Sequence, residues 1–253
     1  MDRNEALRQY ILHHIEDTHE WRLPFFTVHL PGFLSLHGLM LVICAVLLVV
    51  LFGVLYRKKD PVPHGLTNLL ELFVLFVRDQ ISVKALGEED GRRMTPVFCS
   101  FFFFILGLNL LGLIPIFPAA TGNVNVTAAL AIVALSFMVF GAIYKNGLKG
   151  FVMAFVPHGV PWPLKIVLTP LEFLGMFIRA FALTIRLFAN MMAGHIVIFA
   201  LLGLVVVFGW MALPSVLLAV AVYFLELFIA FLQAYIFTLL SAIFIGMIYH
   251  PEH

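Results

Sequence analysis

The sequence predicts an all-α polytopic membrane protein with about five transmembrane helices and one interfacial amphipathic helix. Hydrophobic residues make up 62% of the 253-residue chain and charged residues only 11%, and the mean hydropathy is +1.06. A soluble domain with so few polar side chains could not cover its own surface. Several apolar runs also reach the roughly 20 residues that a helix needs to cross a bilayer. The net charge of +1 gives no reason to expect a nucleic-acid partner.

The first 32 residues differ from the rest of the chain in being polar. They contain His13, His14 and His19 among acidic residues, but no two of these histidines have the i, i+4 spacing of a helical metal site. We therefore expect residues 1–32 to be a solvated extracytoplasmic segment that binds no metal. Residues 33–253 are expected to form a single membrane domain.

The first half of the membrane domain contains three predicted spans. Leu36–Tyr56 has no charged residue and is followed by three basic residues, so it is the first span. Leu66–Leu86 is interrupted by charges, which favours a helix that lies in the membrane interface. The charged residues 88–93 are expected to form a solvated loop. Pro96–Phe117 and Val126–Tyr144 are the second and third spans.

The last two apolar runs are too long to be simple spans. As helices, Pro170–Gly209 would measure ~60 Å and Ser215–Tyr249 ~52 Å, against ~30 Å of hydrocarbon. Neither run can hold two spans and a turn, so both are expected to tilt steeply, by about 55°. They would form an antiparallel hairpin within residues 164–249, connected through Met211–Pro214. The proline-rich stretch from Phe151 is expected to be a short broken helix and loop before this hairpin.

Basic residues predict the orientation of the chain. If the N-terminus is outside, the inside loops contain ten Lys and Arg residues and the outside contains three. Because cytoplasmic loops are enriched in these residues, we expect residues 57–95 and 145–165 and the C-terminus to be cytoplasmic.

An arginine in the hairpin is the first candidate functional residue. Arg186 lies in the middle of a long apolar run, where a cation costs roughly 2.5–3.5 kcal/mol on insertion scales. At 100° per residue, Glu172, Arg179, Arg186 and Asn190 share a narrow arc of one helix face. The alternative interpretation is an arginine that snorkels to the interface or pairs with a neighbouring helix.

The hairpin also aligns its few polar side chains in pairs. Counting outward from the turn, Arg186 is level with Gln233, and His195 is level with Glu226. The second pair lies ~13 Å along the helix from Arg186, toward the outside. Arginine does not titrate in proteins, whereas His195 and Glu226 can accept and pass protons. Hydrogen bonds between helices could explain one such pair, but two pairs indicate a polar path.

Three motifs carry a resemblance to a known family. The stretch from Leu183 to Asn190, Leu-Thr-Ile-Arg-Leu-Phe-Ala-Asn, resembles the signature of subunit a of the rotary ATP synthase membrane sector. The stretches Asn109–Pro115 and Leu232–Phe237 resemble two further motifs of that subunit, in the same order. The resemblance extends from Glu71 to the C-terminus.

The resemblance implies a stator subunit without a catalytic site or a cofactor, in a bacterial plasma (inner) membrane. Such a subunit supplies two offset aqueous half-channels beside a rotating ring of c subunits. Ions enter by one half-channel, neutralise a ring carboxylate, travel round and leave by the other, and this flow drives rotation and ATP synthesis. The implied partners are the c-subunit ring, the peripheral-stalk b subunits, the remaining ATP synthase subunits and the lipid bilayer.

The resemblance also implies roles for individual residues. Arg186 matches the essential arginine that separates the half-channels, and Asn190 and Gln233 match its polar neighbours. Glu172 and Arg179 match charges near the cytoplasmic exit. Many bacterial members have Glu at the position of His195 and His at the position of Glu226, so the pair is exchanged here. This exchange leaves open which of the two is the immediate proton donor, and the choice between H⁺ and Na⁺ also stays open.

Two other kinds of protein fit this sequence less well. A self-contained proton-coupled transporter would show two pseudo-symmetric halves, and no internal repeat is visible. An intramembrane metalloenzyme would need a HExxH-like pair, yet His195 is the only histidine well inside a predicted span. A nucleotide-binding role is not expected, because the chain has no GxxxxGK[ST] motif.

Overall fold

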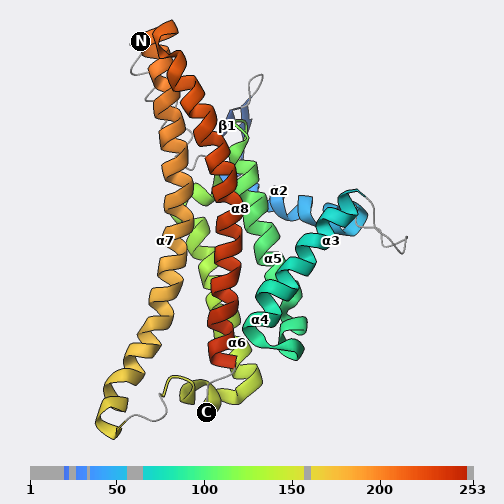
Figure 1. The fold of residues 1–253 in the computed structure, drawn as a ribbon, viewed down its shortest axis with the longest axis vertical. Coiled ribbons are helices and arrows are strands. Elements are labelled where there is room, and N and C mark those ends of the chain that lie inside the picture. Colours follow the sequence, from blue (N-terminus) through green and yellow to red (C-terminus); the bar gives the residue numbers. More distant parts are fainter. Residues whose placement is uncertain (1–19, 23–26, 33–34, 56–64, 157–160, 250–253) are drawn as a thin grey trace. The chain divides into compact units, whose positions relative to one another are not determined.

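The computed structural model describes residues 20–22, 27–32, 35–55, 65–156 and 161–249 and is mainly helical (Figure 1). Five helices in these ranges are long and apolar enough to cross a membrane, which confirms the predicted fold class. They are Leu36–Gly53, Glu88–Leu113, Val124–Met153, Trp162–Val205 and Gly209–Tyr249.

The chain divides into two compact units, which are described separately below. The first unit consists of Met1–Leu55, Phe103–Thr127 and Arg186–Ala234. The second unit consists of Tyr56–Phe102, Ala128–Ile185 and Tyr235–His253. The single membrane domain expected for residues 33–253 stays a prediction.

The first unit begins with a small β-hairpin that the sequence did not predict. Strands β1 (Glu20–Arg22) and β2 (Thr27–His29) pair antiparallel. The indole nitrogen of Trp21 donates a hydrogen bond to the carbonyl of Ile116 over 3.1 Å, and its ring lies 5.8 Å from that of Phe117. Part of the expected N-terminal solvated segment is therefore paired and anchored. The predictions for His13, His14 and His19 lie outside the described residues.

Helix α2 (Leu36–Val50) follows and continues into the π-helix η1 (Leu51–Leu55). It begins at Ser35, whose hydroxyl oxygen accepts a hydrogen bond from the backbone of Gly38, as expected of an N-cap. Cys44 is buried, and its thiol donates to the carbonyl of Phe104 in α5 (Glu88–Leu113). Helix α2 therefore packs against the part of α5 that belongs to the first unit.

The part of the predicted hairpin from Arg186 to Ala234 belongs to the first unit. Helix α7 (Trp162–Phe208) and helix α8 (Leu213–Tyr249) are joined by the short 3₁₀ helix η4 (Gly209–Ala212). The prediction that this helix starts at Pro170 was wrong. Helix α7 begins eight residues earlier, at Trp162, and contains Pro170. A proline is tolerated near a helix start, where Pro163 lies, and also inside membrane helices. The tilt of the hairpin stays a prediction.

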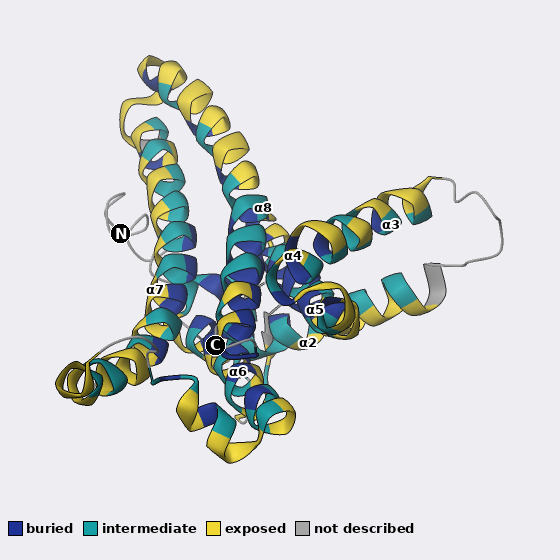
Figure 2. Ribbon diagram, turned by 60° about the horizontal axis from the view of Figure 1, so that its bottom comes forward, coloured by how far each residue is buried: buried dark blue, intermediate teal, exposed yellow. Residues whose placement is uncertain are grey.

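Burial changes along α8 (Figure 2). Residues 213–228 are mostly exposed and apolar, whereas buried residues are frequent in the rest of the helix. Exposed aromatic and aliphatic side chains such as Leu217, Phe224 and Phe228 suit contact with lipid rather than water.

The second unit contains the helical segment expected at residues 66–86, made of α3 (Leu66–Phe76), η2 (Val77–Ser82) and α4 (Val83–Leu86). Four leucines of α3 are exposed with a spacing of three, namely Leu66, Leu69, Leu72 and Leu75. An exposed apolar face of this kind is typical of a helix lying in the interface. Hydrogen bonds from the neighbouring Arg78 guanidinium hold the pKa of Asp79 below its ordinary value.

The prediction of a solvated loop at residues 88–93 was wrong, because α5 already begins at Glu88. The acidic residues Glu88, Glu89 and Asp90 occupy its first turn, where the helix dipole favours negative charge. Salt bridges with i, i+4 spacing join Glu88 to Arg92 and Glu89 to Arg93. These charges therefore start the helix instead of interrupting it.

Helix α6 (Val124–Met153) bends close to the predicted end of the third span. Gly147 has a φ of 71°, which glycine adopts at little cost. Just before it, the side-chain amide of Asn146 donates to the carbonyls of Ile248 and Tyr249 at the end of α8. Lys145 forms an ion pair with Asp90. Within the second unit, these contacts join the ends of α6 and α8 and the start of α5.

Candidate functional site

A buried ion pair lies inside the hairpin, in the first unit. Nδ1 of His195 on α7 is 2.6 Å from Oε1 of Glu226 on α8. The Glu226 side chain is only 3% exposed, although the residues on both sides of it in the sequence are exposed. The structure thus brings together the two titratable residues that the sequence placed at one level. A carboxylate buried among apolar groups is costly unless it is paired.

Both ring nitrogens of His195 also face backbone carbonyls. Nδ1 lies 3.0 Å from the carbonyl oxygen of Met191, one turn earlier in α7, and Nε2 lies 3.0 Å from that of Gly112 at the end of α5. Carbonyl oxygens only accept hydrogen bonds, so both nitrogens are satisfied together only when both carry a proton. The carboxyl group of Glu226 lies beside this ring, with Oε1 2.6 Å from Nδ1.

The contact between the two side chains is close but not a linear hydrogen bond. The Nδ1–H bond is directed at the carbonyl of Met191, so Oε1 of Glu226 has no hydrogen bond of good geometry among the described residues. Its 2.6 Å contact with Nδ1 of His195 is therefore not a hydrogen bond of ordinary geometry. A small movement of either side chain would exchange the carbonyl for the carboxylate as the acceptor of the Nδ1 proton.

Gly194 provides the space for the carboxylate. A Cβ atom at this position would lie 2.5 Å from Oε1 of Glu226 and 2.8 Å from its carboxyl carbon. Separations below about 3 Å force a neighbour to shift, so a side chain here would displace the carboxylate. The absence of a side chain next to His195 thus permits the ion pair.

A second buried polar group fixes α8 beside α5. The side-chain amide of Asn109 donates to the carbonyl of Ala230, over 3.2 Å, and its oxygen accepts a hydrogen bond from the hydroxyl of Thr121 over 2.8 Å. Asn109 and Thr121 are 1% and 0% exposed. Ala230 lies one turn after Glu226 and three residues before Gln233, so this network holds α8 between two predicted site residues.

The remaining predicted residues of the first unit are Arg186, Asn190 and Gln233. Arg186 and Asn190 are half-buried, and Gln233 is 6% exposed. Within the described ranges, no ion pair or hydrogen bond of the Arg186 guanidinium is found. The structure also records no contact between Arg186 and Gln233, so their pairing stays a prediction.

Glu172 and Arg179 belong to the second unit. Nη2 of Arg179 lies 3.5 Å from Oε2 of Glu172, and the guanidinium lies over the ring of Phe244, 5.3 Å from its centre. The carboxylate is about half exposed, so this ion pair contributes little to stability. The two residues form a charged group at a partly open position.

The sequence missed the backbone part of the site. Asn109 and Gly112 lie in a motif that carried the family resemblance, but no residue type signals that the Gly112 carbonyl faces a histidine. Gly194 gave no signal, because its importance depends on a residue of another helix. No group of three or more potential metal ligands occurs in the ranges that the structure covers.

Comparison with known proteins places the chain in a sequence family. The family described as ATP synthase A chain matches residues 38–246. A protein named ATP synthase subunit a from Anaeromyxobacter dehalogenans is 50% identical over 82% of this chain and 56% of its own length. Proteins of the same name from Chloroherpeton thalassium and Myxococcus xanthus are 46% and 43% identical, over 96% and 86% of this chain and 77% and 75% of their own lengths. The chain spans only about half the length of the Anaeromyxobacter relatives.

Proposed function

This chain belongs to the ATP synthase A chain family, and from that membership we propose that it is the stator subunit that guides protons to and from a ring of c subunits. In this proposal the chain provides two offset half-channels, and the ring carboxylates carry protons between them. Proton flow is thereby coupled to rotation and to ATP synthesis. The chain itself binds no nucleotide and performs no chemical step.

The His195–Glu226 pair is the observation that carries the proposal. It is a titratable pair, 2.6 Å apart, at a largely buried position within an otherwise apolar hairpin. Ionisable groups at membrane depth are rare and commonly mark ion pathways or proton relays. In the proposed cycle, the pair receives protons from the outside half-channel and delivers them toward the ring. The position of Nδ1 of His195 between the Met191 carbonyl and the Glu226 carboxyl group supports this role.

Arg186 is proposed to separate the two half-channels. Its guanidinium keeps its charge at any accessible pH, so it cannot pass a proton. Since the described residues offer it no carboxylate, a carboxylate of the c-ring is the partner we expect. Attraction to Arg186 would draw the proton off the ring carboxylate as the ring turns. Asn190 and Gln233 are proposed to line the path beside it.

Glu172 and Arg179 are proposed to lie at the cytoplasmic exit. Their ion pair is partly exposed, which suits a position at the end of a water-filled path. This assignment follows the predicted orientation, with the N-terminus outside and the C-terminus in the cytoplasm of a bacterial cell. The proposed partners besides the c-ring are the peripheral-stalk b subunits and the remaining subunits of the synthase.

The test is replacement of Arg186 in the assembled complex, reconstituted in vesicles. Arg186→Ala should abolish ATP-driven proton pumping, because the barrier between the half-channels and the counter-charge for the ring both disappear. Passive proton leak should persist or rise. Arg186→Lys should rescue poorly, because a compact ammonium can lose its proton when desolvated.

Arg92→Ala is the matched control, because Arg92 forms an exposed salt bridge outside the hairpin. It should leave pumping near the wild-type level. Normal coupled ATP synthesis in Arg186→Ala would refute the proposal. Purification in mild detergent adds an independent check, since the chain should come with c and b subunits.

A further inference from the structure

The C-terminal end of α5 depends on side chains of the hairpin for its hydrogen bonds. The last carbonyls of a helix have no partner within it, and here Pro115, which has no N–H, follows closely. The backbone of Ile114 donates to the carbonyl of Leu111, but no backbone N–H of the described residues donates to that of Gly112 or Leu113. Gly112 and Leu113 are buried, so their carbonyls need partners from elsewhere in the protein.

Two hairpin side chains provide these partners. Nε2 of His195, on α7, lies 3.0 Å from the carbonyl oxygen of Gly112. The hydroxyl of Tyr223, on α8, donates to the carbonyl of Leu113 over 3.3 Å. Consecutive carbonyls at the end of α5 are therefore joined to both helices of the hairpin. All four residues belong to the first unit.

Tyr223 also lies close to the buried carboxylate in the sequence of α8. It precedes Glu226 by three residues, so the two side chains are about 60° apart around the helix and roughly 4.5 Å apart along it. Tyr223 is 38% exposed, whereas Glu226 is 3% exposed. The hydroxyl bond thus joins the turn of α8 that precedes Glu226 to the end of α5.

The end of α5 also packs closely against α7. A Cβ atom at Gly112 would lie 2.8 Å from Cε of Met191 and 3.0 Å from Cα of Ala119. Met191 is the residue whose carbonyl faces Nδ1 of His195. A shift of the end of α5 would therefore move the carbonyl at Nε2, while the carbonyl at Nδ1 would stay with α7.

We propose that Tyr223 is a positioning residue for His195. By bonding to the Leu113 carbonyl, the Tyr223 hydroxyl holds the end of α5 where the adjacent Gly112 carbonyl faces Nε2. Without this hydroxyl, the buried Leu113 carbonyl would lose its partner, and the end of α5 would move to satisfy it. The effect on pumping rests on the proposed function, whereas the orientation of the ring does not.

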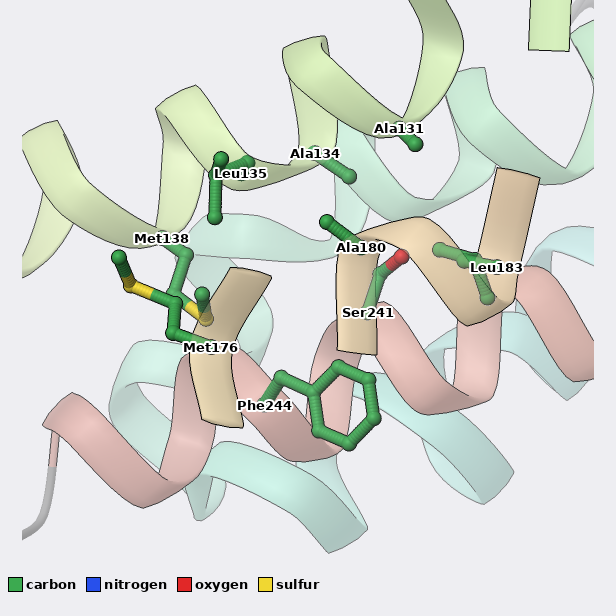
Figure 3. A pocket seen from close by; sticks show the side chains of 9 residues that line it. All are labelled: Ala131, Ala134, Leu135, Met138, Met176, Ala180, Leu183, Ser241 and Phe244. Carbon is green, nitrogen blue, oxygen red and sulfur yellow. The ribbon is translucent and has the colours of Figure 1, made fainter. Parts of the chain in front are cut away.

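Ser241 provides a matched comparison on the same helix. Its hydroxyl oxygen is buried and makes no hydrogen bond with any residue in the described part of the chain. Figure 3 shows the Ser241 side chain among apolar neighbours, beside a space of about 20 Å³ in the second unit. Removing this hydroxyl breaks no hydrogen bond to a described residue, unlike removing the hydroxyl of Tyr223.

The first measurement reads the histidine ring directly. The full chain, labelled with ¹⁵N-histidine and reconstituted in lipid bilayers, gives ring-nitrogen signals in solid-state NMR, and His195→Gln identifies those of His195. Tyr223→Phe keeps the aromatic ring and removes only the hydroxyl, so it should move the Nε2 signal. Ser241→Ala should leave that signal unchanged. A loss of stability alone would lower the unfolding temperature without moving the signals of the folded chain.

The second measurement is ATP-driven proton pumping by the assembled complex in vesicles. Tyr223→Phe should slow pumping about two- to fivefold, the lower part of the range for one hydrogen bond, because 3.3 Å is long for a hydroxyl donor. Ser241→Ala should pump at the wild-type rate. Placing 4-aminophenylalanine at position 223 returns a donor to the same place and should restore both the Nε2 signal and the pumping rate.

Unchanged ring signals of His195 in Tyr223→Phe would overturn the inference and leave the proposed function intact, because Arg186→Ala tests that function separately. Failure of 4-aminophenylalanine to restore the signal would also overturn it, since the hydrogen bond would then not be the cause. Moved signals with an unchanged pumping rate would overturn the role of Tyr223 in pumping.

Discussion

Nε2 of His195 lies 3.0 Å from the carbonyl oxygen of Gly112, so the end of α5 is a third partner of the hairpin pair. Without the Gly112 carbonyl, His195 would need only one donor nitrogen, the one that faces Met191 and Glu226. With it, both ring nitrogens face backbone carbonyl oxygens, and the carboxyl group of Glu226 lies beside the ring. Gly112 thereby orients the ring through its backbone carbonyl.

Exchanging His195 and Glu226 tests whether they act as one unit. His195→Glu alone places two carboxylates at one position, and Glu226→His alone removes the carboxylate, so each single variant should lose most ATP-driven pumping. The double exchange restores one residue of each kind, and pumping should recover in large part. A double-mutant cycle on the pumping rates should give a favourable interaction of about 0.5–3 kcal/mol.

The recovery in the double exchange should nevertheless stay below the wild-type rate. A carboxylate at position 195 would face the carbonyl oxygens of Gly112 and Met191, which cannot donate to it. Purely additive losses in the two single variants would mean that the side chains act separately.

Adding a methyl group at Gly194 should disturb the pair without removing either member. In Gly194→Ala, the new Cβ would fall 2.5 Å from Oε1 of Glu226, so the carboxylate must move. We expect pumping to fall several-fold with little loss of stability, because the atoms that must shift are the end of the flexible Glu226 side chain. Gly53→Ala is the control, because a Cβ there meets nothing within 4 Å, and it should be neutral in both assays. Equal pumping rates for the two variants would argue against a positional role for Gly194.

The hydrogen bonds of Asn109 should matter for stability as well as pumping. Asn109→Leu removes the donor to the Ala230 carbonyl and leaves the buried hydroxyl of Thr121 without its acceptor. The expected cost is about 1–3 kcal/mol, measured by thermal unfolding of the purified chain. Asn125→Ala, at an exposed position whose side chain does not join this network, is the control. An unchanged unfolding temperature in Asn109→Leu would mean that the network does not hold α8.

The sequence predicted the helices better than their ends. The spans and the helical segment 66–86 follow from the lengths of apolar runs and from interrupting charges, and both signals are local. The start of α5 was missed because Glu88, Glu89 and Asp90 suggest a loop by composition, although a helix N-terminus favours acidic residues. The β-hairpin was missed because each strand has three residues and depends on Trp21, which is anchored 95 residues away.

Only the part of the site that consists of side chains could be predicted from the sequence. Charged and titratable residues in an apolar run stand out, and the position of the turn aligned His195 with Glu226 before their distance was known. The carbonyl of Gly112 and the space at Gly194 depend on how helices approach each other. Such backbone and packing features have no counterpart in residue type, so the sequence alone could not supply them.

The predicted orientation can be tested with two exposed positions. Met211, in the turn of the hairpin, is 87% exposed, and Leu148, after the bend of α6, is 67% exposed. Cysteines at these positions, in a background with Cys44 and Cys99 replaced, should react with a membrane-impermeant maleimide from opposite sides of the membrane. Met211→Cys should be labelled in intact cells, and Leu148→Cys only in inverted vesicles, because basic residues are enriched in cytoplasmic loops. Tyr144→Cys, 93% exposed at the cytoplasmic end of the predicted third span and just before the bend, should behave like Leu148→Cys. Labelling of Met211→Cys and Leu148→Cys from one side would show that the number of spans between them is not the odd number that the predicted topology requires.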